Sequence, residues 1–142
     1  MKNENMKKNN KGFSLVELIV VIAIMAVLMV VLAPAMLRYV EKTRVQKDDS
    51  AVSEVTHAVE LALAQEDIYT EAGGNDVTLT VNDSSNSGTI AATSHPKLLQ
   101  DVKNTVGDTI VPVSKARKNK TYTVTATYSD TRQAYTVTGS WN

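Results

Sequence analysis

Residues 12–37 read GFSLVELIVVIAIMAVLMVVLAPAML, and this stretch decides how the rest of the chain is interpreted. No residue from Leu18 to Leu37 carries a charge. A helix of about 20 residues is long enough to cross the hydrocarbon core of a bilayer. A short segment with four lysines, residues 1–11, precedes the run. The sequence therefore predicts a membrane-spanning helix near the N-terminus.

A cleavable secretory signal is the competing interpretation, because Ala33-Pro34-Ala35 has the pattern of a signal cleavage site. The apolar run is longer than the roughly 7–15 residues of a signal peptide core, and a helical pattern continues past it, so we favour the membrane helix. Basic residues are balanced on the two sides of the run, so the positive-inside rule predicts no orientation.

Glu17 is the one charged residue between Gly12 and Leu37. A charge well inside a bilayer costs about 3 kcal/mol or more, so the acid either lies at headgroup depth or needs a partner. The apolar run itself supplies no cation to pair with it.

The segment Gly12-Phe13-Ser14-Leu15-Val16-Glu17-Leu18, after a Lys-rich leader and before a long apolar run, resembles the processing and N-methylation motif of type IV prepilins and pseudopilins. The resemblance implies that a prepilin peptidase cuts after Gly12 and methylates the amine of Phe13. It also implies that the Glu17 carboxylate pairs with the Phe13 amine of a neighbouring subunit, which would set the register of the assembled helices.

The same resemblance implies an α+β pilin fold with a cleaved leader (residues 1–12), a transmembrane and filament-core helix (13–40) and a globular head (41–142). The expected partners are copies of the chain in a filament, a prepilin peptidase, an assembly platform protein and, indirectly, its ATPase. The chain would be stored in the membrane and assembled at the cell surface, with no cofactor. It is most similar to cysteine-free major pilins of Gram-positive bacteria; a pseudopilin and a single-span membrane-anchored binding protein are the alternatives.

Pro34 falls late in the apolar run, where many members of that family have a proline. A proline inside a helix removes one hydrogen bond and clashes with the carbonyl four residues earlier, here that of Val30. It either produces a kink with no further role or allows the helix between about Met25 and Pro34 to loosen during assembly.

Beyond Leu37 the pattern stays helical and becomes amphipathic, and we expect one helix from Phe13 to about Glu66, with a stop near Gly73-Gly74. Its apolar stripe is predicted to pack on a sheet and consists of Val52, Val55, Val59, Ala62 and Leu63. The charged residues between Arg38 and Asp49 are interpreted as a solvated collar, with contacts between adjacent subunits as the alternative.

The remaining sequence predicts a small antiparallel sheet. Alternating residues indicate a strand at 77–81, a polar loop at 82–88, an extended piece at 89–93 and a short helix from Pro96 to about Val106. Residues 110–113 are apolar, but Pro112 restricts them to an edge strand or to irregular structure. A hairpin is predicted last, from strands 121–128 and 133–141, whose aromatic faces should cover the apolar stripe.

Composition excludes several kinds of site. The chain has no cysteine, and its 15 basic and 15 acidic residues balance, so it is not typical of a polyanion-binding protein. We assign no metal to His57 or His95 and no calcium to the loop aspartates. No catalytic constellation is present. The run at 115–120 is either a solvated loop or a surface patch for host or other anionic ligands, formed by Lys115, Arg117, Lys118 and Lys120.

Overall fold

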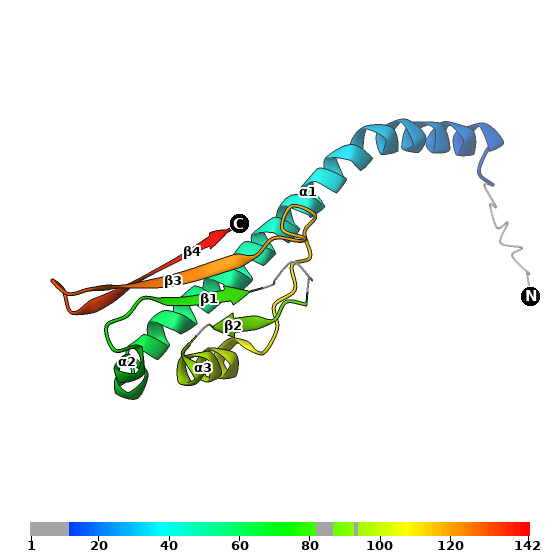
Figure 1. The fold of residues 1–142 in the computed structure, drawn as a ribbon. Helices are drawn as coiled ribbons and strands as arrows, with labels where there is room; N and C mark the ends of the chain where they lie inside the picture. Colours follow the sequence, from blue (N-terminus) through cyan, green and yellow to red (C-terminus); the bar gives the residue numbers. More distant parts are fainter. Residues whose placement is uncertain (1–11, 82–86, 93) are drawn as a thin grey trace, which may run out of the picture. The chain divides into compact units, whose positions relative to one another are not determined.

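The structure is a computed structural model that describes residues 12–81, 87–92 and 94–142. It divides into two compact units, Met1–Tyr39 and Val40–Asn142, and we call the second unit the head. Helix α1 (Leu15–Leu63) contributes its first part to one unit and its second part to the other. The head adds two short helices and a four-stranded antiparallel sheet, so the predicted α+β class is confirmed (Figure 1).

Helix α1 ends earlier than the sequence predicts. The backbone N–H groups of Ala64 and Gln65 donate to the carbonyls three residues earlier, which tightens the last turn. Gln65 is then extended, and a separate helix α2 (Glu66–Ala72) follows. The prediction of one helix to about Glu66 is therefore wrong in this detail. The break redirects the chain so that Ile68 is buried in the core, and α2 stops at Gly73, which has a left-handed conformation.

The sheet has the strand order β2-β1-β3-β4. Strands β1 (Val77–Val81), β2 (Ile90–Ala92), β3 (Tyr122–Ser129) and β4 (Ala134–Trp141) confirm the predicted strands, and α3 (Pro96–Val106) confirms the predicted helix. The predicted loop falls partly on residues 82–86, and the extended piece ends at Thr93; these lie outside the described residues. Residues 110–113 form no strand, in agreement with the restriction that Pro112 imposes.

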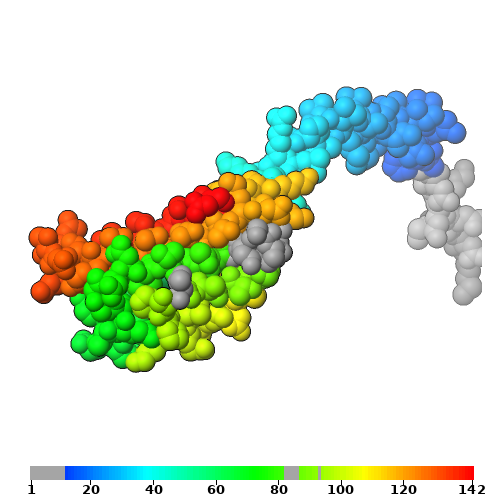
Figure 2. All heavy atoms as spheres, in the orientation of Figure 1, coloured from blue at the N-terminus to red at the C-terminus, as the bar shows by residue number. Residues whose placement is uncertain are grey.

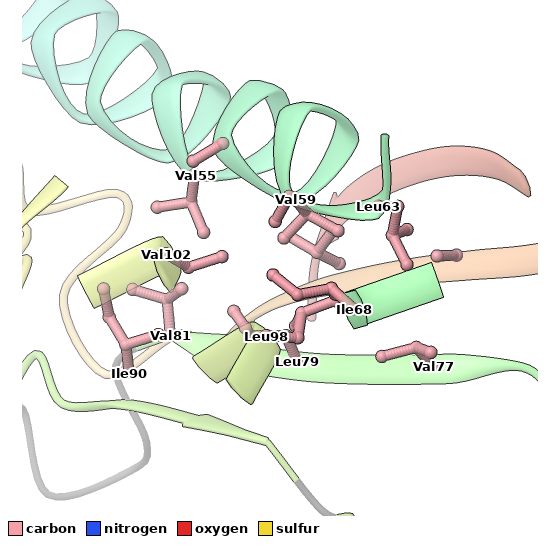
Figure 3. Packing of buried hydrophobic residues seen from close by; sticks show 14 of the residues in the cluster. Val55, Val59, Leu63, Ile68, Val77, Leu79, Val81, Ile90, Leu98 and Val102 are labelled. Carbon is pink, nitrogen blue, oxygen red and sulfur yellow. The ribbon is translucent and has the colours of Figure 1, made fainter. Parts of the chain in front are cut away.

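One face of the sheet carries the core of the head (Figure 3). Val55 and Val59 of α1 and Leu98 and Val102 of α3 pack over the alternating apolar residues of β1, all almost fully buried. Burying each such side chain contributes about 1.5–3 kcal/mol before entropy is counted. Every residue of the predicted apolar stripe is buried, and the aromatic face of the hairpin packs against the same cluster.

Gly139 of β4 is required by this packing. A Cβ atom at this position would collide with the hydroxyl group of Tyr122 and would lie 2.8 Å from Oγ1 of Thr56. These two hydroxyl groups are hydrogen-bonded to each other across the core edge, with their oxygens 3.0 Å apart. The absence of a side chain at Gly139 therefore leaves room for the hydrogen bond between Tyr122 and Thr56, which links strand β3 to α1.

Candidate processing and assembly segment

Residues 12–40 present a mainly apolar surface to the surroundings, interrupted by the charged side chains of Glu17 and Arg38. Every residue in this range is exposed, including Phe13 at 92% and the large aliphatic side chains up to Leu37. Soluble monomers rarely expose apolar patches of more than a few hundred Å². Within the described part of the chain, α1 is the one helix long and apolar enough to cross a membrane. The first part of α1 therefore needs either lipid or other protein surfaces around it.

The Gly12–Phe13 peptide bond lies just outside this helix. Residues 12–14 have no regular secondary structure, and α1 begins at Leu15. A Cβ atom added to Gly12 would meet no atom within 4 Å. The packing of the described chain therefore places no demand for glycine here.

Glu17 lies in the first turn of α1 and caps the helix. The backbone N–H of Ser14 donates to the Glu17 carboxylate at 2.9 Å, while the N–H of Leu18 donates to the Ser14 carbonyl at 3.2 Å. The bond from the Ser14 N–H to the Glu17 side chain is one of the two hydrogen bonds of a capping box. The helix dipole also favours a carboxylate at this position. The sequence showed no cationic partner for Glu17, and the structure adds a neutral donor within the chain. An ionised carboxylate has about four acceptor sites, so capacity remains for a cation.

Pro34 lies inside α1, which is helical on both sides of it. The missing N–H leaves the carbonyl of Val30 without its usual helical donor. Both interpretations of the proline, a kink and a point of loosening, remain predictions.

The acidic residues near the start of the head anchor a distant loop. Asp48 is 4% exposed, and its carboxylate accepts backbone hydrogen bonds from Val113 at 2.9 Å and from Ser114 at 2.8 Å. The carboxylate of Glu41 accepts another from the N–H of Lys115 at 2.6 Å. Figure 2 shows the yellow-orange loop against the cyan part of α1. The interpretation of residues 38–49 as a solvated collar is therefore wrong for Asp48, and Glu41 is engaged with the loop.

Sequence reasoning missed this role, although a signal was present. Asp48 lies four residues before Val52 and so falls on the same stripe of α1 as the buried valines. A charged residue on a buried stripe indicates a satisfied polar contact rather than a solvated face.

Arg117 lies in the same anchored loop and faces inward. Its guanidinium group forms an ion pair with Asp49, with Nη2 3.0 Å from Oδ1, and its Cζ atom lies 5.0 Å from the centroid of the Trp141 ring. The indole Nε1–H of Trp141 donates to the same carboxylate at 2.9 Å. The predicted basic patch therefore lacks a freely presented Arg117, whereas Lys115, Lys118 and Lys120 are exposed.

The other singled-out polar residues have local roles. His57 is exposed and hydrogen-bonded to Glu60, with 3.0 Å between Nδ1 and Oε2. His95 occupies the position before α3, and the carboxylate of Glu71 accepts from the first N–H groups of that helix, those of Lys97 and Leu98. Over residues 12–81, 87–92 and 94–142 no cluster of three or more acidic or histidine side chains could hold a metal ion.

Three tyrosines lie together where α2 meets the β3–β4 hairpin. Tyr69 of α2 stacks edge-on against Tyr128 and Tyr135 of the hairpin, with centroid distances of 6.3 and 5.6 Å. The Tyr69 hydroxyl donates to the Gln133 carbonyl at 3.1 Å and is also hydrogen-bonded to the Tyr128 hydroxyl, with 3.3 Å between the oxygens; the bond to Tyr69 is the main cause that raises the pKa of Tyr128 to about 12. Tyr135 accepts the N–H of Gly74 at 3.1 Å, while burial raises its pKa. This cluster fixes α2 to the hairpin.

Comparison with known proteins identifies the N-terminal segment. Residues 7–33 match the family model of the prokaryotic N-terminal methylation motif. No curated protein and no solved structure matches the chain. The matched residues include Gly12, Phe13 and Glu17, together with most of the exposed part of α1. The match and the fold together support a type IV pilin-like prepilin.

Proposed function

We propose that the chain is the major structural subunit of a type IV pilus, which polymerises through residues 13–37. The carrying observation is an apolar helical segment without any buried residue, joined to a folded head and headed by the methylation motif. Such a segment can be stored in a bilayer and then be buried among copies of itself. Residues 1–12 act as the leader, 13–40 as the membrane and filament-core helix, and 41–142 as the surface-exposed part.

Processing prepares the assembly contact. A prepilin peptidase hydrolyses the Gly12–Phe13 bond, so a neutral amide becomes an amine with an ordinary pKa near 8, protonated at neutral pH. Methylation of that amine keeps the positive charge. The Ser14 N–H stays in the mature chain and holds the Glu17 carboxylate at the helix end. The free lone pairs of this carboxylate then accept the Phe13 ammonium of a neighbouring subunit.

Assembly takes place at the membrane with a platform protein and, through it, an ATPase. The completed filament serves adhesion, surface motility or aggregation. Lys115, Lys118 and Lys120 provide cations for anionic surface ligands, since all three are exposed in the head.

The test is Glu17→Val in the full-length chain, examined by electron microscopy of sheared cell-surface material. We expect membrane-inserted chain with a folded head and no filaments, because assembly loses its charge pair while valine suits the lipid. Glu54→Val is the matched control, since Glu54 is an exposed acid of the head, and we expect it to form filaments. Normal filaments from Glu17→Val would contradict the proposed role of this residue.

A pseudopilin of a secretion or DNA-uptake system is the second candidate, because the methylation motif fits it equally well. The two functions differ in abundance: a major pilin dominates sheared surface material, whereas a pseudopilin remains with the cell envelope. A membrane-anchored binding protein would instead retain residues 1–12 and tolerate the loss of Glu17.

A further inference from the structure

A groove runs between β4 and the end of α1 in the head. Its volume is about 360 Å³, and it lies beside the edge strand of the sheet. Its lining combines apolar, aromatic and acidic side chains, chiefly Leu63, Val137, Tyr69, Tyr135, Glu60 and Glu66. Glu60 and Glu66 are both exposed; one oxygen of Glu60 is hydrogen-bonded to His57, so Glu66 is the main carboxylate offered to a ligand.

This lining fits a long aliphatic side chain that ends in a cation. The four-carbon stem of a lysine can lie along Leu63 and Val137, while its ammonium group reaches a carboxylate. The rings of Tyr69 and Tyr135 add an attraction for a cation placed over their faces. A neutral or acidic side chain would leave the Glu66 carboxylate without a counter-charge.

The head itself carries such cations at its opposite end. Residues 40–49 and 115–120 together contain seven Lys or Arg and three Asp or Glu, whereas residues 54–76 contain six Asp or Glu and no Lys or Arg. The contacts of Asp48 and Arg117 hold the loop at 115–120 against the first of these ends. Along α1, Lys47 and Leu63 are separated by about 24 Å at 1.5 Å per residue.

A single head therefore cannot bring its own basic loop to its own groove. Two heads that point the same way can, because the basic end of one then meets the acidic end of the next. Such a contact uses two different surfaces and repeats without closing, which is the kind of contact that generates helical filaments. Complementary charge also sets the register and opposes antiparallel association.

We propose that this groove binds the Lys115 to Lys120 loop of a second copy of the chain, with Lys118 as the inserted residue. Lys118 and Lys115 are exposed and lie on a loop that is already held in place. The proposal rests on the proposed filament function and adds a contact between heads to the contact between helices. It assigns the acidic groove to assembly rather than to a small-molecule ligand.

The test uses disulfide trapping. Because the chain contains no cysteine, only the introduced cysteines can form disulfide bonds. The full-length Glu66→Cys, Lys118→Cys double variant is oxidised in sheared filaments and examined on a non-reducing gel. We expect a ladder of covalent dimers, trimers and longer species. Glu66→Cys with Gln100→Cys is the matched control, because Gln100 is exposed on α3 outside both surfaces, and it should give no species longer than a dimer. Either single variant should give at most dimers.

Charge reversal gives an independent readout. Glu60→Lys with Glu66→Lys should lower the mass of sheared filaments by about tenfold or more, and adding Lys115→Glu with Lys118→Glu should restore it. Filaments that give no ladder above the control, or reversal that the second pair fails to rescue, would overturn the contact while leaving the pilus function intact. Absence of filaments from the unmodified chain would overturn both.

Discussion

Replacing Asp48 with alanine tests how the head is held together. Asp48 is almost fully buried, and its carboxylate accepts the N–H groups of Val113 and Ser114. Each buried donor left unpaired costs about 1–3 kcal/mol, so Asp48→Ala should lower the free energy of unfolding by about 2–5 kcal/mol. Asp48→Asn retains one acceptor oxygen, so its free energy of unfolding should lie between those of the original chain and of Asp48→Ala.

The measurement is urea denaturation of the purified full-length chain in detergent, followed by far-ultraviolet circular dichroism. We expect a lower midpoint with an unchanged slope. Asp130→Ala in the exposed hairpin turn is the control and should stay within about 0.5 kcal/mol of the original chain. A change of less than about 0.5 kcal/mol for Asp48→Ala would refute the reasoning, because it would mean that water satisfies both donors at no cost.

Three further predictions concern the hairpin. Gly139→Val should lower the unfolding free energy by about 1–3 kcal/mol or more in the same denaturation assay, because its side chain collides with a buried tyrosine hydroxyl. Asp49→Ala should shift the fluorescence emission of Trp141, the single tryptophan, to longer wavelength, since the carboxylate that holds the indole is lost; unchanged emission would contradict this contact. In an absorbance titration one tyrosine should ionise near pH 12, and Tyr69→Phe should return the pKa of Tyr128 toward 10.

The direction of the last effect follows from linkage. A tyrosine whose pKa is higher in the folded state than in the unfolded state favours folding while it is protonated. That contribution is fully present below about pH 10 and is lost as the pH rises through about 12. Alkaline unfolding of the Tyr69→Phe variant should therefore begin at lower pH than that of the original chain.

Regular elements could be predicted from the sequence because their signals are local. The alternation of Val77 to Val81, the Pro96 start of α3 and the spacing of Val52, Val55 and Val59 each reflect a repeat of two or 3.6 residues. The break at Ala64 and Gln65 has no such signal, since neither glycine nor proline occurs there. It arises from the gain in burying Ile68, which depends on the assembled core.

The processing segment was predictable from the sequence, whereas the anchored loop was not. Gly12, Phe13 and Glu17 lie within a few residues of one another, so their spacing can be recognised directly. Asp48 and Asp49 contact residues more than 60 positions later in the chain, and without the fold they resemble any exposed acids. The capping bond of Glu17 is also local, but it depends on where the helix begins.

The proposed function requires that the chain is cut after Gly12 and then assembles through its apolar helix. Mass spectrometry of the chain recovered from sheared surface filaments tests this claim most directly. We predict an N-terminal peptide that begins with Phe13 and carries one added methyl group. Recovery of a chain that still begins with residues 1–12, or absence of the chain from the filaments, would contradict it.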